Sequence, residues 1–172
     1  MKMLPMLASL DHNLSLALYR FTKQHATVRQ VARVCASVLI WALAAMIVGS
    51  LTVTSALLGL PILVGAFFTG HIINAIIEHY RWRERPYKTH HFEPLISQRW
   101  LHGSFPSDHA MMAAVLAAVW VGMGGAWPAP VIATALLVGL GRILVGVHYV
   151  SDIIVGFATG AAASLLFLLL LT

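Results

Sequence analysis

Charged side chains are absent from three long stretches of the chain. Residues 34–77, 109–141 and 153–172 contain no Asp, Glu, Lys or Arg. A helix that crosses the hydrocarbon core of a membrane needs about 20 consecutive, mostly apolar residues. Backbone polar groups in lipid must also be satisfied within their own segment, so such stretches are expected to be helical. The pattern therefore predicts an all-α integral membrane protein.

The first stretch is long enough for two spans, the second for two short ones and the third for one. We expect five transmembrane helices that form one helical bundle, at about residues 34–50, 57–80, 107–122, 131–145 and 152–172. A short turn at residues 51–55 and a Gly/Pro-rich turn at 122–130 separate neighbouring spans, and residues 81–106 form a polar loop. Gly156 and Gly160, four apart in the last span, are expected to let helices pack closely.

The N-terminal segment has a different pattern. Between residues 10 and 23 the positions of Leu10, Leu14, Leu18 and Phe21 fall on one helical face, while polar residues lie elsewhere. A helix with one apolar stripe and basic residues is typical of a segment that lies in the membrane interface. We therefore divide the chain into an N-terminal interfacial segment, residues 1–33, and a membrane domain, residues 34–172.

Composition supports a membrane protein and argues against several other classes. Of the 172 residues, 59% are hydrophobic and only 10% are charged, whereas soluble domains carry about 25% charged residues. The net charge of +5 is not accompanied by a soluble basic domain, so we expect no nucleic-acid partner and assign the N-terminal basic residues to the membrane interface. The single cysteine, Cys35, is expected to be a packing residue and does not indicate a redox compartment.

Three polar motifs interrupt the apolar pattern, and counting the spans brings them to one side of the membrane. The motifs are Glu84-Arg85-Pro86, Pro106-Ser107-Asp108-His109 and the set Arg142, His148 and Asp152. The first span leads away from the N-terminal face and the second returns to it. The third and fourth spans form the next hairpin and return the chain to the same face. All three motifs are therefore predicted to meet at one membrane surface.

The residue types in these motifs fit the binding of a phosphate group. Arg85 and Arg142 carry planar guanidinium groups that donate paired hydrogen bonds to phosphate oxygens. For Arg85 the alternative is snorkelling at the end of a span. Ser107 or Asp108 can cap a helix whose first backbone N–H groups attract an anion, although an ordinary capped helix would also explain these two residues.

The histidines add a possible nucleophile and a possible acid. His148 and Asp152 are four residues apart, so on a helix a carboxylate can fix the imidazole tautomer and raise its basicity. We expect His148 to attack phosphorus and His109 to protonate the departing oxygen. Water activated by His109 would then hydrolyse the phosphohistidine. The same arrangement without turnover would be a phosphate-binding site.

These motifs resemble those of the type 2 phosphatidic acid phosphatase family of integral membrane lipid phosphatases. The resemblance covers about residues 34–172, and eight residues match in order and spacing: Arg85, Pro86, Pro106, Ser107, His109, Arg142, His148 and Asp152. It implies that His148 is the nucleophile, Asp152 its partner and His109 the acid and base. It also implies a phosphate site made by Arg85, Ser107, the backbone around Asp108, and Arg142. The family it resembles needs neither a metal nor another cofactor for hydrolysis.

The chain departs from the family pattern at three positions. Glu78 stands where the family has lysine, Asp108 replaces a glycine and Gly141 replaces a serine. Glu78 inverts a charge near an anion site, so the lysine's role is not transferred to it. We treat Glu78 and Arg81 as auxiliary residues that share a helix face with Arg85 and can pair.

Other charged residues of the polar loop have more than one interpretation. Arg81, Arg83 or Lys88 are candidates to supply the positive charge lost at Glu78. The polar residues His90, His91, Glu93 and His102 match no standard metal-ligand spacing. We interpret these four as a polar loop near lipid headgroups and expect no metal.

The run from Ser104 to His109 resembles the bacitracin-resistance branch, the undecaprenyl-diphosphatases. This resemblance favours undecaprenyl diphosphate as the substrate, converted to undecaprenyl phosphate, with membrane lipids as the other partners. Phosphatidylglycerophosphate, phosphatidate, lipid A or a polyprenyl-linked sugar phosphate are alternatives, as is a non-catalytic lipid-phosphate binder. Oligomeric state is not indicated.

The resemblance also implies a bacterial inner membrane, with the site on the periplasmic side. The positive-inside rule indicates the opposite side, because all eleven Lys and Arg are predicted to lie on the face that carries the motifs.

Overall fold

The computed structural model describes residues 3–53, 58–98 and 102–171, and within these ranges the chain is helical and contains no strand. The helices are α1 (Met3–Gln24), α2 (Ala26–Ser37), α3 (Leu39–Val53), α4 (Gly59–Tyr80), α5 (Pro86–Thr89), α6 (Asp108–Gly122), α7 (Pro128–Leu144) and α8 (Val150–Leu171). The predicted all-α fold is confirmed. The predicted turn at residues 51–55 is shorter at its start, because α3 continues to Val53, and the rest of it lies outside the described residues.

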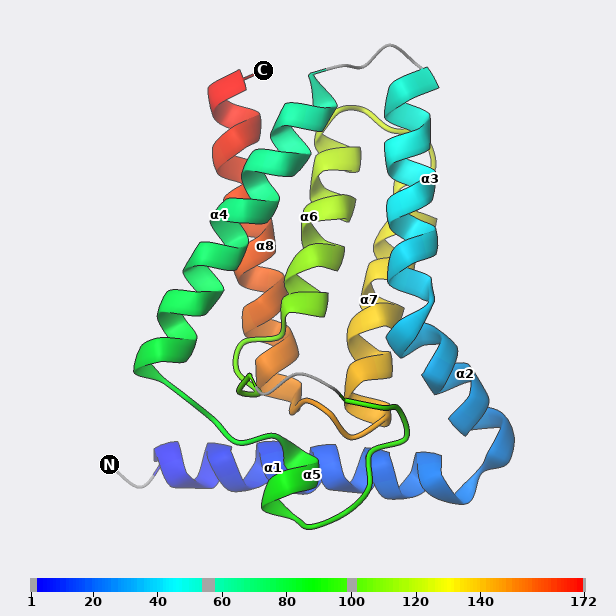
Figure 1. Ribbon diagram of the computed structural model, residues 1–172, viewed down its shortest axis with the longest axis vertical. Coiled ribbons are helices and arrows are strands. Elements are labelled where there is room, and N and C mark those ends of the chain that lie inside the picture. The colour runs from blue at the N-terminus through cyan, green and yellow to red at the C-terminus, as the bar shows by residue number, and fades with distance from the viewer. Residues whose placement is uncertain (1–2, 54–57, 99–101, 172) are drawn as a thin grey trace.

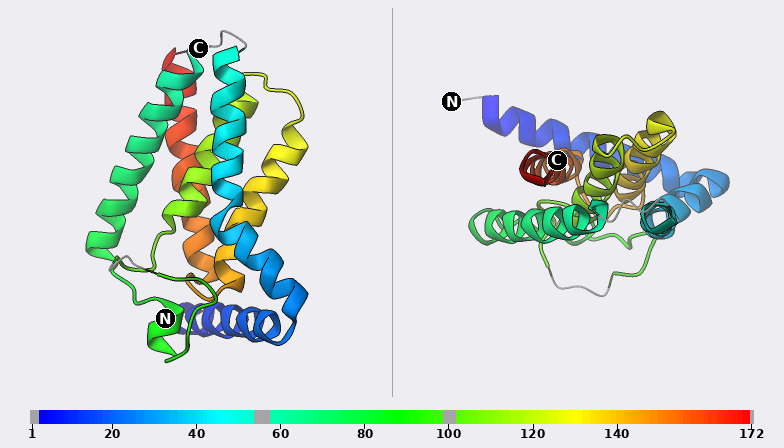
Figure 2. Two further views of the ribbon diagram at one scale, coloured as in Figure 1. Left: turned by 45° about the vertical axis from the view of Figure 1, so that its right-hand side comes forward. Right: turned by 90° about the horizontal axis from the view of Figure 1, so that it is seen from above.

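Helices α3, α4, α6, α7 and α8 form an upright bundle, and α1 lies across one end of it (Figure 1). Helix α6 is central and contacts each of the other four bundle helices, which Figure 2 shows from above. The core of the bundle consists of apolar side chains that are fully buried, among them Ile40, Ile62, Met111, Val119 and Val138. The end of the bundle that carries α1, α5 and the first turns of α6 and α8 is called the site end below.

Two glycines allow α8 to approach α6 closely. A Cβ atom at Gly156 would collide with the carbonyl oxygen of Ser107, and one at Gly160 would collide with the carbonyl oxygen of Met111. Both partners are backbone atoms of the first turn or the start of α6, so they cannot move aside as a flexible side chain would. The expected role of these glycines in close packing is therefore observed, and it fixes the start of α6 against α8.

The lengths of the helices leave the number of membrane crossings open. Helices α4 and α8 are long and apolar enough to cross a membrane, and a third span results if α2 and α3, which meet at a bend of 43°, are taken together. Helices α6 and α7 are apolar but shorter. The five predicted spans thus correspond to five observed bundle helices, while a count of five crossings stays a prediction.

Helix α1, Met3–Gln24, extends further toward the N-terminus than the helical pattern predicted at residues 10–23, and it packs polar side chains against the protein. Leu10, Leu14 and Phe21 each expose about half of their surface, whereas the polar residues Ser15 and Tyr19 are buried against the site end. An outward apolar face suits a helix that lies in the membrane interface. The predicted division after residue 33 falls within α2 and stays a prediction.

Candidate active site

The three motifs lie together at the site end. A cavity of about 330 Å³ is lined by side chains from each of them, including Arg85, Asp108, His109, Arg142 and His148. These residues come from the start of α5, the first turn of α6, the end of α7 and the α7–α8 connection. The convergence that span counting predicts is therefore present in the structure.

His148 is held in one tautomer by a backbone carbonyl. Its Nδ1 lies 2.7 Å from the Ser104 carbonyl oxygen, and because that oxygen only accepts, Nδ1 must carry the proton. The Asp152 carboxylate is 3.5 Å from the same nitrogen. The tautomer is thus the expected one, with Nε2 unprotonated. The short contact to Nδ1, which we expected from Asp152, comes from the Ser104 carbonyl instead.

Burial keeps this imidazole uncharged. Removal from water lowers the pKa of His148 from 6.5 to about 4, the nearby Arg85 and Arg142 act in the same direction, and the hydrogen bond with Asp152 opposes them. A neutral imidazole at neutral pH has an available electron pair on Nε2. This is the form that a nucleophile requires.

The carboxylate of Asp152 is fully buried and accepts three hydrogen bonds. Its Oδ2 accepts from the Ser104 hydroxyl at 2.5 Å and from the Tyr149 backbone N–H at 2.7 Å. Its Oδ1 accepts from Arg83 at 2.9 Å. Ser104 therefore contacts both Asp152 and His148 and links the loop before α6 to the start of α8.

Sequence reasoning missed the roles of Ser104 and Arg83. Ser104 belongs to the run that carries the resemblance, and this was the only signal for it. Arg83 was a candidate to replace the charge lost at Glu78. Instead its guanidinium donates to Asp152 and lies 3.7 Å from the centre of the Tyr149 ring. The interpretation of Arg83 as a replacement for the lost charge is therefore wrong.

The two arginines of the motifs are buried beside the histidine. Arg85 is only 7% exposed, which excludes simple snorkelling, and it donates to the carbonyl oxygens of His102 and Val147. Its NH1 also lies 3.3 Å from Nε2 of His148. Arg142 donates from NH1 to the Ala36 carbonyl, and its Nε has no hydrogen-bond partner among the described residues. An anion bound by these guanidinium groups would lie next to Nε2.

The start of α6 is capped as predicted. Ser107 precedes the helix, and its hydroxyl accepts from the Ala110 backbone N–H at 3.4 Å. The Ser107 N–H donates to the Asp152 carbonyl oxygen at 3.0 Å, which ties this cap to α8. His109 follows in the first turn of α6 and lines the cavity.

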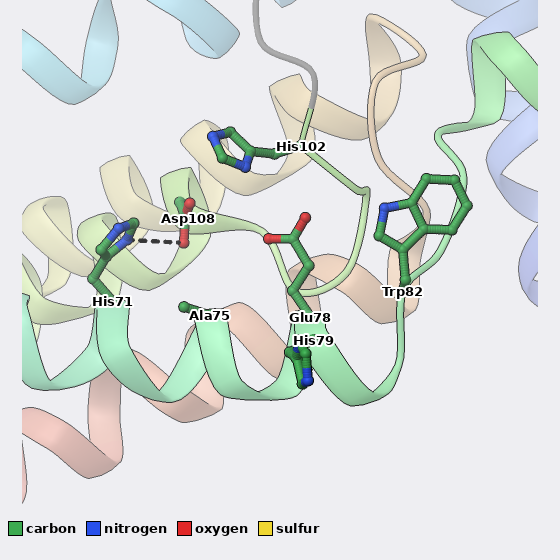
Figure 3. A pocket seen from close by; sticks show the side chains of 7 residues that line it. All are labelled: His71, Ala75, Glu78, His79, Trp82, His102 and Asp108. Atoms are coloured by element: carbon green, nitrogen blue, oxygen red, sulfur yellow. Dashed lines mark ion pairs between the residues drawn. The ribbon is translucent and has the colours of Figure 1, made fainter.

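Asp108 and Glu78 face a second hollow that adjoins the first. This hollow has a volume of about 380 Å³ and is lined mainly by α4 (Figure 3). Asp108 accepts from the Asn74 side chain at 2.9 Å and lies 3.6 Å from His71. Glu78 accepts from the Gly103 N–H at 2.5 Å. Both carboxylates thus have local partners beside the phosphate-binding groups.

The predicted pairing of Glu78 with Arg81 and Arg85 is wrong. Helix α4 ends at Tyr80, so the two arginines lie beyond it and do not continue the face of Glu78. No ion pair joins Glu78 to either arginine within the described part of the chain. Arg81 is exposed and lines neither hollow, which leaves Glu78 as the only one of the two auxiliary candidates in contact with the cavity.

Gly141 has a packing role at the position where the resemblance expects serine. A Cβ atom there would lie 2.7 Å from the backbone nitrogen of Ala36. Helices α2 and α7 therefore need glycine for their close approach. The neighbouring Arg142 reaches the Ala36 carbonyl through the same contact.

The polar loop shows no grouping of metal ligands. Over residues 3–53, 58–98 and 102–171, no three His, Cys, Asp or Glu side chains are arranged to hold a metal ion. His90 packs edge-on against His12 of α1, and His102 lines the cavity.

Residues 57–172 match the sequence model of the PAP2 superfamily, which is more than half of the chain. The chain belongs to the PAP2 superfamily. The match begins shortly before α4, so α1, α2 and α3 lie outside the part of the chain that matches this superfamily. The resemblance inferred from the three motifs is confirmed.

One curated relative matches part of the chain. It is lipid A 1-phosphatase from Rhizobium johnstonii (strain DSM 114642 / LMG 32736 / 3841), which is 40% identical over 63 residues. These residues are 37% of this chain and 26% of the relative. The match therefore spans about a quarter of that protein's length.

Two solved structures share the PAP2 fold over nearly the whole chain. Aquifex aeolicus LpxE has a TM-score of 0.69 and 23% identity, and the alignment covers 90% of this chain and 94% of that one. The transmembrane PAP2 type phosphatidylglycerolphosphate phosphatase from Bacillus subtilis also has a TM-score of 0.69, with 26% identity and coverage of 94% and 84%. The first similarity supports the fold, and the second supports a membrane-embedded PAP2 protein.

Proposed function

We propose that the protein is a membrane lipid phosphatase that works through a phosphohistidine at His148. The observation that carries this proposal is the state of that imidazole. Its Nδ1–H is held by the Ser104 carbonyl, and Nε2 lies 3.3 Å from an Arg85 guanidinium nitrogen. A phosphate bound by Arg85 would therefore be next to the electron pair that attacks it.

The proposed reaction has two balanced steps. In the first, Nε2 of His148 forms a bond to phosphorus, the bond to the leaving oxygen breaks, and His109 gives that oxygen a proton. In the second, His109 takes a proton from water, whose oxygen displaces His148 and releases phosphate. Arg85 and Arg142 balance the charge on the equatorial oxygens. These steps use side chains of the chain alone, without a metal or cofactor.

Three observations favour different substrates. The run from Ser104 to His109 supports undecaprenyl diphosphate, our first candidate, through its resemblance to the undecaprenyl-diphosphatases. The 40% identity to a lipid A 1-phosphatase supports a phosphorylated glycolipid, and the structural similarity to a phosphatidylglycerolphosphate phosphatase supports a glycerophospholipid phosphate. All three present a terminal phosphate on a membrane-anchored lipid, which suits a site at one end of a membrane bundle.

Phosphate release by the purified protein in detergent tests the proposal. Undecaprenyl diphosphate, lipid A and phosphatidylglycerophosphate are compared as substrates, with His148→Ala as the matched variant. Release that His148→Ala abolishes supports the phosphatase, and the order of kcat/KM values ranks the substrates. If folded protein binds these lipids but releases no phosphate from any of them, the alternative of a non-catalytic lipid-phosphate binder replaces the proposal.

We place this activity in a bacterial inner membrane, with the site on the periplasmic side. The resemblance to the undecaprenyl-diphosphatases supports this side, whereas the basic residues around the site support the cytoplasmic side. The chemistry itself needs several of these arginines, which weakens their value for orientation. A cysteine placed at exposed Arg81 and labelled by a membrane-impermeant reagent in whole cells distinguishes the two sides.

A further inference from the structure

Helix α1 contributes a carboxylate, Asp11, that is linked to Asp152 through Arg83. Oδ2 of Asp11 accepts hydrogen bonds from Arg83 NH2 at 2.8 Å and from the Ser151 hydroxyl at 2.6 Å. Oδ1 of Asp11 accepts from the Ser151 backbone N–H at 3.0 Å. This side chain is only 13% exposed, and it comes from a helix that lies outside the PAP2 match.

The same helix caps the N-terminus of α8. The first N–H groups of a helix have no partner within it and need acceptors from elsewhere. Tyr149, which precedes α8, has no short polar side chain to serve as a cap. The Val150 N–H donates to the Ser15 hydroxyl at 3.1 Å, and the Ser151 N–H donates to Asp11. Two side chains of α1 therefore supply caps that the local sequence lacks.

Arg83 connects this cap to the site. Its NH2 binds Asp11 and its NH1 binds Asp152, so one guanidinium bridges two carboxylates. A buried carboxylate such as Asp152 is costly unless a partner of opposite charge is held in place. Asp11 fixes the second arm of the guanidinium and thereby limits the positions that the first arm can take.

We propose that Asp11 is a positioning residue for the hydrolysis, acting on Asp152 through Arg83 and through the first turn of α8. Asp152 in turn orients Ser104, whose carbonyl holds the His148 tautomer. The interfacial helix is thus part of the catalytic apparatus without touching the substrate. This inference rests on the proposed function, because it concerns the rate of the step at His148.

Steady-state kinetics of α1 variants tests this role. The variants are Asp11→Ala and Asp11→Asn, with Asn13→Ala as a matched control on the exposed side of the same helix. We expect Asp11→Ala to lower kcat by about 10–100-fold, as loss of an outer-shell partner of a site histidine does in metal sites. KM should stay within about twofold, because Asp11 does not line the cavity. Asp11→Asn keeps an acceptor for Ser151 and should recover part of the loss.

A double-mutant cycle separates positioning from general loss of stability. If Asp11 acts in part through Arg83, the effect of Asp11→Ala on kcat should be clearly smaller in an Arg83→Gln background, and the remainder is the effect of the cap on α8. Independent effects that multiply would overturn the proposal, as would an Asp11→Ala enzyme with the kcat of Asn13→Ala. Should Asp11→Ala fail to fold, Asp11→Asn takes its place in the cycle.

Hydrogen exchange gives a readout that does not depend on activity. Amides at the start of α8 should exchange faster in Asp11→Ala than in the Asn13→Ala control, because the Ser151 N–H loses its acceptor. Equal exchange would refute the capping role even if the wild-type protein released no phosphate. A wild-type protein that is inactive on every lipid would instead count against the proposed function alone.

Discussion

The two ends of the bundle are built on different principles. At the site end, Arg85, Arg142, His148 and Asp152 are buried and joined by hydrogen bonds to the backbone and to one another. At the opposite end, the residues of the α6–α7 connection carry no charge, and Trp127 is 79% exposed. The site end therefore has its geometry fixed by directional contacts, whereas the opposite end needs only apolar packing and a turn.

The α6–α7 turn at the opposite end has few constraints from neighbouring side chains. Gly124 and Trp127 both have positive φ values, of 73° and 56°, and a Cβ atom at Gly124 would meet no atom within 4 Å. Within this turn, the Trp120 indole donates a local hydrogen bond to the Ala126 carbonyl. Changes at this end should alter stability slightly and leave the site unaffected.

The largest expected effect is that of His148→Ala at the site end. Removing the proposed nucleophile should lower kcat by roughly 1,000-fold or more, as loss of a catalytic nucleophile does in other hydrolases. Trp127→Ala at the opposite end is the matched control and should retain wild-type kcat/KM. Phosphate release by both variants is the measurement. Substantial turnover by His148→Ala would reject the phosphohistidine route.

Arg142→Lys tests whether directional hydrogen bonds or charge alone define the site end. Lysine keeps the charge but loses the planar fork that reaches both the Ala36 carbonyl and an anion. We expect a loss of about 100-fold in kcat/KM, within the range for removal of one transition-state donor. An unchanged value would mean that charge suffices at this position.

The pH dependence of kcat/KM reports the burial of His148. The neutral imidazole is the active form, and its pKa is lowered to about 4. His109 must carry a proton to act as the acid in the first step, so its titration is corrected for together with that of the substrate. The loss of activity that comes from protonating His148 should then begin only below about pH 4, at tenfold per unit. A decline that begins near pH 6.5 would indicate an imidazole that is exposed to water.

The lowered pKa of His148 also makes the stability of the protein depend on pH. In the unfolded chain His148 has the ordinary pKa of 6.5, whereas in the folded protein its pKa is about 4. Between these two pH values the unfolded chain therefore binds a proton that the folded protein does not. The free energy of unfolding should therefore fall as pH falls between these two values. Thermal unfolding of wild type and of His148→Ala over this range isolates the contribution, which the variant lacks.

A pair of glycine substitutions compares the two ends directly and gives the smallest expected effects. Gly156→Ala forces a methyl group against the Ser107 carbonyl, which should cost about 1–3 kcal/mol of stability and lower activity, because Ser107 is part of the site. Gly124→Ala meets no neighbour but holds a left-handed φ, so it should cost only about 1 kcal/mol and leave kcat/KM unchanged. Equal losses of activity would contradict the proposed difference between the ends.

Much of the fold could be predicted because apolar stretches and their breaks are local signals. The five bundle helices, the interfacial helix and the meeting of the motifs followed from these signals and from the order of the spans. The expected pairing of Arg81 with Glu78 was wrong, because the end of α4 at Tyr80 could not be located within a polar run. Ser104, Arg83 and Asp11 were missed because their roles arise from contacts between segments far apart in the chain, which no periodicity records.

Helix α1 buries the polar Ser15 and Thr22 and most of Asp11, while Leu10 and Leu14 are exposed. An amphipathic helix on a soluble protein does the reverse at such positions. Among homologues that share this helix, we therefore expect the usual pattern of variation to be inverted. Leu10 and Leu14 should accept almost any apolar residue, while Asp11 and Ser15 should vary little. The exposed Leu10 and Leu14 would be mistaken for buried positions if burial in this helix were inferred from hydrophobicity alone. A hydrophobic substitution at Asp11 would be damaging, although it makes the helix more apolar.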